Sequence, residues 1–469
     1  MKRSALLVGV TWSALACGDG TGSPSNAATS AAASEGSATS GPGSGGESAG
    51  EATAHGGETG ASGSDGTSAT DGGGDSGTGD TTGGESADCG TSLQILDPGA
   101  DVGAAIAAAP PGSTICLADG EYDGFVLDGV SKDPRVTVLA VHRLQASFTS
   151  AVSVSGGTNG FTFDGFTFAE ISIDGADTRE LTFRNYDQTE HFEIDGVMTD
   201  APNILLENFT QSDISLADGS TPGIWFSFSG RSTPVATIRN ATIDGGCSDG
   251  IQSGVPFVLE NSRILNKQVG DCANDPHTDG VQLYGGPYDG TIIRNNYFYG
   301  NVQVLAAYDG VDHVLIENNI FDPGADGERR PCQIEWYSDD SSIIRHNTLL
   351  YRSSEYPGSI CLDRKASDDA GVGTVVEDNI AAEISTSNGS TVAQRTSNLL
   401  RSGAASSDIA GIPSYMGGDF PATVPDFALV SGSPGSGAAS SPNGSDVGAD
   451  TTAFASMVSD PGVATRVGP

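Results

Sequence analysis

The stretch TIIRNNYF (residues 291–298) and its repeat VLIENNIF (residues 314–321) decide the fold of this chain. In both, alternating apolar residues are followed by a charged residue, a small polar residue and a second short apolar run. The pattern recurs in FTFDGFTF from Phe161, LTFRNYD from Leu181, ILLENFT from Ile204, ATIRNATI from Ala236, FVLENSRI from Phe257, SIIRHNTL from Ser342 and TVVEDNIA from Thr374. Such a repeat, at spacings of 20 to 34 residues, predicts stacked β-coils whose inward side chains pack on the neighbouring coils.

The charged position of the repeat changes sign at every coil, which predicts a ladder of ion pairs. Its members are Asp164, Arg184, Glu207, Arg239, Glu260, Arg294, Glu317, Arg345 and Glu377. Stacked strands lie about 4.8 Å apart, so each charge has opposite charges as neighbours. Exposed pairs contribute only about 0.2–1 kcal/mol each, and their main effect is expected to be on strand register. These arginines are therefore predicted to be structural and not catalytic.

The next position is small and polar, which suits the bend of each coil. Its members are Gly165, Asn185, Asn208, Asn240, Asn261, Asn295, Asn318, His346 and Asp378. Asparagine tolerates a left-handed backbone, so it can occupy a tight bend. Extra residues can leave the corners as loops, which makes variable spacing compatible with a regular stack.

Both ends of the repeat region also have recognisable features. The segment VGAAIAAAPPGSTICLADGEYDG (102–124) predicts a short helix and a first strand over 113–117, and the helix would cover the open end of the stack. It resembles the N-terminal cap of right-handed parallel β-helix proteins related to pectate lyases. The segment FALVSGSPGSGAASSPNGSDVGADTTAF (427–454) resembles the C-terminal tail of secreted members. The resemblance implies an all-β, right-handed parallel β-helix with an N-terminal capping helix. It implies no single activity, because this fold hosts lyases, hydrolases, epimerases and adhesive proteins.

The N-terminal residues are typical of an export signal. Lys2 and Arg3 precede an apolar run too short to span a bilayer. The run ends in Ala-Leu-Ala-Cys-Gly, which resembles the lipobox of bacterial lipoproteins, so residues 1–17 are predicted to be a signal peptide with Cys17 lipidated. Ordinary secretion is the alternative. Residues 18–88 are rich in Gly, Ser, Thr and acidic residues and predict a disordered linker. Residues 89–469 would then form the β-helix domain, with an irregular tail from about residue 400.

Charge limits the partners of the folded region. Of the 60 acidic and 21 basic residues of the chain, 49 acidic and 19 basic residues lie beyond residue 88. Nucleic-acid binding needs a basic face, so no nucleic acid is expected as a partner. The acidic excess also counts against an anionic polymer. We expect a monomer at the cell surface or outer membrane, held there only by the lipid anchor, or a secreted protein.

Cysteine content agrees with export. Six cysteines follow Cys17, and an even number in an exported chain predicts disulfides. They are Cys89, Cys116, Cys247, Cys272, Cys332 and Cys361. Neighbours along the sequence would give three pairs, each closing about one coil, although the sequence does not decide the connectivity.

A second strand in each coil carries a recurrent glutamine. If Ile251, Val281, Val302 and Ile334 point inward, alternation places four glutamines on the outer face. These predicted substrate-binding residues are Gln252, Gln282, Gln303 and Gln333, joined by Glu335, Tyr337, Arg364 and Lys365, with Tyr284 and Asp363 beside them. Amides, carboxylates and aromatic rings suit a sugar chain. An amide ladder that only holds register is the alternative.

The insertion LNKQVGDCANDPHTDG (265–280) lies beside this glutamine column. It brings Lys267, Asp275, His277 and Asp279 to one coil. A histidine with aspartates two residues before and after it can act as a general base or a metal ligand. The alternative is a turn that starts at Asp-Pro and carries a solvent-exposed histidine.

The triplet Asp275-Pro276-His277 resembles the Asp-Pro-His motif of mannuronan carbon-5 epimerases. The resemblance implies that Asp275 and His277 act at the acidic carbon of a sugar. Position in the repeat, and not the motif, adds Asp279, Tyr284 and Lys267 as further catalytic candidates, with Lys365 as an alternative basic residue.

Three functions remain open from sequence. The first is a lyase or epimerase acting on a uronic-acid-containing polysaccharide, with Gln252, Gln282 or a calcium ion neutralising the carboxylate. Calcium would be held by Asp249, Asp275 and Asp279, although the site can also work without a cofactor. The second is a non-catalytic protein of the cell surface that binds glycans or mediates adhesion. The third is a glycoside hydrolase that uses two carboxylates, for which Asp249, Asp279, Glu335 and Asp363 are available.

Overall fold

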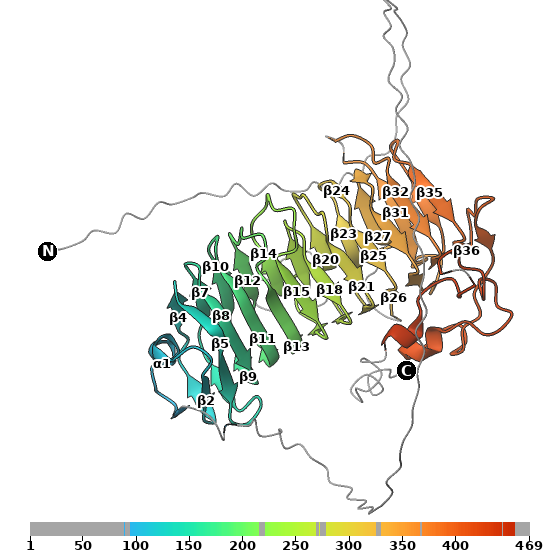
Figure 1. Cartoon of the computed structure of the whole chain (residues 1–469). Helices are drawn as coiled ribbons and strands as arrows, with labels where there is room; N and C mark the ends of the chain where they lie inside the picture. The colour runs from blue at the N-terminus through green and yellow to red at the C-terminus, as the bar shows by residue number, and fades with distance from the viewer. Residues whose placement is uncertain are drawn as a thin grey trace, which may run out of the picture. The chain divides into compact units, whose positions relative to one another are not determined.

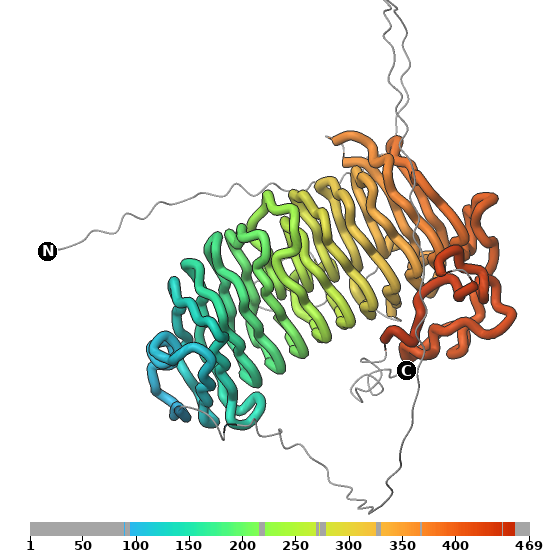
Figure 2. Tube along the Cα trace, in the orientation of Figure 1, coloured from blue at the N-terminus to red at the C-terminus, as the bar shows by residue number. Residues whose placement is uncertain are grey.

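The computed structural model describes residues 89, 94–214, 221–268, 272, 278–324, 330–365, 368–442 and 444–454. Within these ranges the chain forms a parallel β-helix, in which successive coils stack along one axis (Figure 1). Figure 2 follows the same stack from the blue N-terminal coils to the orange C-terminal coils. The predicted fold class is confirmed. The predicted signal peptide, with Cys17, and the predicted linker lie outside the described residues, so both stay predictions.

The strands form three parallel sets along the stack. The first set, here called the ladder sheet, comprises β1 (Gln94–Leu96), β2 (Thr114–Leu117), β5 (Ser131–Ala140), β8 (Asn159–Asp164), β11 (Arg179–Gln188), β13 (Ile204–Ser212), β15 (Ala236–Arg239), β18 (Val258–Glu260), β21 (Ile292–Arg294), β25 (Leu315–Glu317), β29 (Ile343–Arg345), β32 (Thr374–Glu377) and β35 (Val392–Thr396). The second set comprises β3 (Gly120–Tyr122), β6 (Ala146–Phe148), β9 (Phe166–Phe168), β16 (Thr242–Asp244), β19 (Arg263–Leu265), β22 (Tyr297–Tyr299), β26 (Ile320–Asp322), β30 (Thr348–Leu349), β33 (Ile380–Ala381), β36 (Leu399–Leu400) and β37 (Ile409–Ala410). Strands β11 and β13 are long enough to pair with both sets.

The third set, here called the site sheet, carries the candidate functional residues. Among the described residues it comprises β4 (Val126–Asp128), β7 (Val152–Ser155), β10 (Ile171–Asp174), β12 (Phe192–Asp195), β14 (Ile224–Phe226), β17 (Ile251–Ser253), β20 (Asp279–Leu283), β23 (Gln303–Ala307), β27 (Cys332–Tyr337), β31 (Ser359–Asp363) and β34 (Ile384–Thr386). Strands β24 (Val311–Asp312) and β28 (Asp339–Asp340) form a separate short parallel pair. Inward side chains of all three sets form one continuous apolar core.

The predicted charge ladder is confirmed residue by residue in the strand register. Four arginines each pair with the acidic residue of the preceding coil. The distances are 2.8 Å for Arg184–Asp164, 2.7 Å for Arg239–Glu207, 2.7 Å for Arg294–Glu260 and 2.6 Å for Arg345–Glu317. The bend column is left-handed as predicted: φ is 88° at Gly165 and 51° to 56° at the eight positions that follow it.

A second polar ladder runs inside the stack, and sequence reasoning missed it. It lies one residue after the bend and consists of Asn296, Asn319, Asn347, Asn379 and Asn398, all fully buried. Each side-chain amide donates a 3.0 Å hydrogen bond to the side-chain oxygen of the next member. The second asparagine of Asn-Asn in the repeats at 291–298 and 314–321 was the available signal.

Each end of the stack is covered. Helix α1 (Val102–Ala108) buries Val102 and Ile106 against the first coils, and Asp101 caps its start by accepting from the Ala104 amide at 2.9 Å. The C-terminal tail, with the 3-10 helices η2 (Val424–Phe427) and η3 (Thr451–Phe454), packs on the second set of strands. It is fixed to the bend column where Asp378 accepts from Ser440 at 2.7 Å.

The predicted disulfides are confirmed as the three pairs of sequence neighbours: Cys89–Cys116, Cys247–Cys272 and Cys332–Cys361. Disulfides form in oxidising compartments, which agrees with export. Within the described ranges, no helix is both long and apolar enough to cross a bilayer.

Candidate functional site

Strand register decides which side chains share the outer face of the site sheet. One outward column runs across six consecutive strands through Trp225, Gln252, Gln282, Ala306, Glu335 and Cys361. Gln252 and Gln282 are half-buried neighbours in this column, as predicted. Tyr337 and Asp363 pair in the next outward position, two residues further along their strands.

The prediction that Gln303 and Gln333 face outward is wrong, because both side chains are fully buried. Gln303 pairs with Asp279, since Leu305 and not Val302 is the register partner of Val281. The amide of Gln303 therefore turns inside and donates to the Cys332 carbonyl at 2.6 Å. For Gln333 the reason is a register shift between Cys332 and Ile334, which breaks simple alternation at that point.

Glu335 lies at the centre of the candidate site, between two tyrosines. The Tyr337 hydroxyl donates to Glu335 Oε1 at 3.1 Å, and the Tyr308 hydroxyl lies 3.5 Å from Oε2. The two rings contact edge to face, with centroids 5.3 Å apart. Tyr308 was not predicted as a site residue, because its place beside Glu335 depends on the register of β23.

The pKa of the Glu335 carboxyl is raised on this face. Burial raises its pKa above the ordinary value of 4.5, and the charge of Asp279 adds to the effect. Tyr337 and Arg330 act in the opposite direction without cancelling it. Burial followed by the charge of Glu335 raises the pKa of Tyr337 to about 12, and burial also raises that of Tyr308, so both hydroxyls remain donors.

A neighbouring carboxylate is perturbed in the opposite direction. Burial alone would raise the pKa of Asp363, but hydrogen bonds outweigh burial and hold it below the ordinary value of 3.8. The donors are the Ser387 side chain, the Arg364 amide at 2.7 Å and the Asn388 side chain at 2.6 Å. The site sheet therefore presents one carboxyl whose pKa is raised and one whose pKa is lowered.

The amide pair is held by buried aspartates. Gln252 donates to Gln282 Oε1 and to Asp249 Oδ2, the latter at 3.2 Å. Asp249 Oδ1 accepts from the Asp279 backbone amide at 2.8 Å, and both carboxylates are buried. Both oxygens of Asp249 are thus engaged in hydrogen bonds. The third predicted calcium ligand, Asp275, lies outside the described residues together with His277, so calcium binding and the role of the Asp-Pro-His motif stay predictions.

Tyr284 and Trp225 form a fixed unit of this surface. The Tyr284 hydroxyl accepts from Trp225 Nε1 at 3.0 Å and donates to the Phe226 carbonyl at 3.0 Å. With its proton directed to a backbone carbonyl, Tyr284 is better suited to orient Trp225 than to transfer a proton. Trp225 itself was missed, because nothing in its short apolar strand distinguishes it from a core residue.

The predicted basic residues differ in burial and in their contacts. Lys267 is 1 % exposed and donates to the Gly245 carbonyl at 2.6 Å. Burial lowers its pKa to about 8, partly opposed by the charges of Asp249, Asp244 and Asp213. Lys365 pairs with Asp309 at the surface. Arg364 is exposed and follows Asp363 directly, at the end of β31.

Lys267 is expected to make stability depend on pH between about 8 and 10.5. Its folded pKa lies below its unfolded value, so the unfolded chain binds the proton more strongly in this range and the free energy of unfolding rises with pH. Urea unfolding at both ends of the range should show a stability increase in the wild type that Lys267→Met loses. Lys365→Met, with an exposed side chain, is the control and should retain the increase. If the free energy of unfolding changes equally with pH in wild type and Lys267→Met, the lowered pKa of Lys267 would be contradicted.

The fold and the site together define a parallel β-helix protein with a polar and aromatic outer face centred on Glu335. No family model matches the chain, and no curated protein sequence matches it. Solved structures similar to it include the pectate lyase Pel9A, at 16% identity and a TM-score of 0.43, covering 76% of this chain and 96% of that one. The A-module of the Azotobacter vinelandii mannuronan C-5 epimerase AlgE4 is 17% identical, with a TM-score of 0.32 and coverage of 66% and 94%.

A third similar structure is PfbA, a surface adhesin of Streptococcus pneumoniae. It is 14% identical, with a TM-score of 0.34, and the match covers 63% of this chain and 84% of that one. The stacked parallel strands of the structure itself confirm the parallel β-helix fold that the sequence resemblance implied. At these identities and TM-scores the similarity does not extend to activity.

Proposed function

We propose that this chain binds a polysaccharide across the outer face of the site sheet and hydrolyses its glycosidic bonds, with Glu335 as the proton donor. The observation that carries the proposal is the half-buried carboxyl of Glu335, whose pKa is raised and which two tyrosine hydroxyls hold in place. Hydrolysis needs such an acid, because the departing sugar oxygen must be protonated as the bond breaks.

The outward column supplies groups that suit a sugar chain. Trp225 and the two tyrosines beside Glu335 offer ring faces and edges for the apolar side of a sugar. Gln252 and Gln282 offer amide groups for hydroxyls. Because these residues lie on neighbouring coils, a glycan would lie along the stack and cross several strands.

Asp363 is the best candidate for the second carboxylate. It lies one coil beyond Glu335 and two residues further along the strand. Spacings of about 4.8 Å between strands and about 3.3 Å per residue put the two backbone positions about 8 Å apart. Carboxyl groups separated by about 6.5–9.5 Å leave room for a water and invert the anomeric centre. In this arrangement Glu335 donates its proton to the leaving oxygen, and the charged Asp363 takes a proton from the attacking water.

The test is a product assay on the purified chain with neutral, amino-sugar and uronic polysaccharides. Hydrolysis releases reducing ends without an unsaturated product, and the first product should have the inverted anomeric configuration by NMR. Saturable binding of a polysaccharide with no new reducing ends on any of them would leave a non-catalytic glycan-binding protein and overturn the proposal.

Elimination or epimerisation of a uronic acid unit is a second candidate, favoured by the adjacent amides of Gln252 and Gln282 on the outer face. Such amides could neutralise a sugar carboxylate while a base removes the neighbouring proton. An unsaturated product or an altered epimer ratio, lost in His277→Ala and retained in His55→Ala, would support it. Products formed equally by both variants would remove the predicted role of His277.

A further inference from the structure

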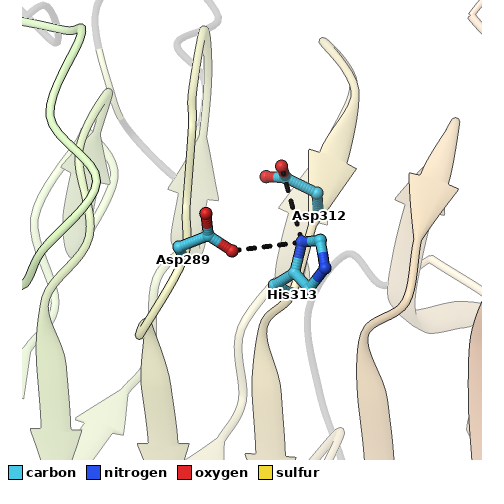
Figure 3. Close-up of side chains that lie close together, drawn as sticks. All are labelled: Asp289, Asp312 and His313. Atoms are coloured by element: carbon cyan, nitrogen blue, oxygen red, sulfur yellow. Dashed lines mark ion pairs between the residues drawn. The ribbon is translucent and has the colours of Figure 1, made fainter. Parts of the chain in front are cut away.

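Three side chains of types that can bind a metal ion lie close together outside the strands of the site sheet. Asp289 lies in the turn between β20 and β21, whereas Asp312 ends β24 and His313 follows it. Figure 3 shows the imidazole and the two carboxylates converging from these two neighbouring coils. Their side chains are exposed by 50%, 35% and 53%, respectively, so an ion could reach them from solvent.

One ring nitrogen faces both carboxylates. His313 Nδ1 lies 3.1 Å from Asp289 Oδ1 and 3.6 Å from Asp312 Oδ2 (Figure 3). Among the described residues, the imidazole of His313 forms only these two ion-pair contacts, and neither has hydrogen-bond geometry. His142 provides the contrast within the same chain, since its Nδ1 is hydrogen-bonded to Asp119 at 2.9 Å. His142 therefore forms a simple hydrogen-bonded pair with an aspartate, whereas His313 does not.

The spacing of the three atoms fits a small divalent ion. Zinc binds imidazole nitrogen and carboxylate oxygen at about 2.0–2.2 Å in tetrahedral geometry, which places ligand atoms about 3.3–3.5 Å apart. The two contacts of His313 Nδ1 lie on either side of that value. All the ligand atoms lie within 4.8 Å of one another, which leaves space for one ion.

Surrounding hydrogen bonds orient the ligands. The Tyr288 backbone amide donates to Asp312 Oδ1 at 3.1 Å, which leaves Oδ2 on the side of the imidazole. The His313 backbone amide donates to the Asp340 carbonyl at 3.0 Å, and φ at His313 is 52°. Secondary contacts of this kind set the direction of a metal ligand before an ion arrives.

We infer that Asp289, Asp312 and His313 form a site for a first-row divalent cation, with zinc as the preferred ion. One imidazole and two carboxylates match the ligand preferences of zinc better than the all-oxygen sets that calcium and magnesium prefer. Three protein ligands leave one tetrahedral position for water or a ligand oxygen. The site does not depend on the proposed hydrolysis, because none of its residues takes part in that reaction.

Calorimetric titration of the EDTA-treated full-length chain with zinc chloride tests the site. His313→Asn is the informative variant, because asparagine tolerates the left-handed backbone that this position requires. Wild type is expected to bind one more zinc per chain than His313→Asn, or to bind at this site at least about tenfold more tightly. Asp289→Asn should show the same loss.

The matched control is His142→Asn, which removes an exposed histidine–aspartate pair and should leave zinc binding unchanged. Thermal unfolding without metal shows whether each variant is folded, and added zinc should raise the melting temperature of wild type but not of His313→Asn. Identical titrations of wild type and His313→Asn, or an equal loss in His142→Asn, would overturn the inference.

Discussion

Replacing Glu335 with Gln is expected to lower the rate of glycan hydrolysis by about 10²–10⁴-fold, the usual contribution of a general acid. The substitution keeps the size of the side chain and one oxygen that can accept from Tyr337 or Tyr308, but it replaces the other oxygen with an amide donor and removes the transferable proton. Glycan affinity should change little, so the loss should lie in kcat and not in KM. Release of reducing ends under saturating substrate measures this effect.

The pH profile gives an independent readout of the same residue. A general acid works only while protonated, so activity should fall as the pH rises through the pKa of Glu335, above 4.5. A general base works only while charged, so activity should also fall as the pH drops through the pKa of Asp363, below 3.8. Glu190→Gln, at an exposed corner, is the matched control. Unchanged kcat in Glu335→Gln would assign the proton transfer to another group.

Replacing Asn347 with Ala is expected to lower the free energy of unfolding by about 3–5 kcal/mol, because buried polar groups lose their partners. The side-chain amide of Asn347 donates to the Ile316 and Arg345 carbonyls at 3.0 and 2.9 Å. It also donates to Asn379 at 3.0 Å, and its oxygen accepts two 3.0 Å bonds from Asn319. All three asparagines are fully buried, so water cannot replace these bonds.

Asn295→Gly provides the control for this destabilisation. Asn295 belongs to the bend column, has φ of 55° and accepts one side-chain bond, from Asn318 at 2.8 Å. Glycine adopts this backbone readily, so its cost should stay near 1 kcal/mol. Urea unfolding of the two variants measures the difference. Equal destabilisation would mean that the fully buried ladder contributes no more than the half-buried Asn295 of the bend column.

The stack was predictable because its signals are local. Sign alternation from Asp164 to Glu377 and the polar bend column repeat within each coil, and each repeat predicts the same position in the next. The second asparagine of the repeat carries a further local signal, because its equivalents also contact one another in neighbouring coils. The disulfide pairs followed from the same logic, since sequence neighbours one coil apart are neighbours in space.

The site was only partly predictable, because extra residues enter the coils at their corners. Gln252 and Gln282 belong to strands with the same local motif, so their alignment was correct. The alignment failed at Gln303, where the strand pairs three residues later than its sequence pattern indicates. The same shift brings Tyr308 toward Glu335 and was invisible without the register.

By itself the sequence determined the parallel β-helix, its charge ladder and its left-handed bends, because each depends on a repeat whose members contact their own equivalents. It also indicated disulfides between sequence neighbours, but the structure decided their connectivity. Only the tertiary structure decided which outward side chains lie together. Which outward side chains meet depends on the hydrogen-bonded pairing between coils of unequal length. The spacing of residues along the chain does not reveal that pairing. The grouping of Glu335 with Tyr308 and Tyr337, the inward turn of Gln303 and the convergence of His313 with two aspartates all follow from that pairing.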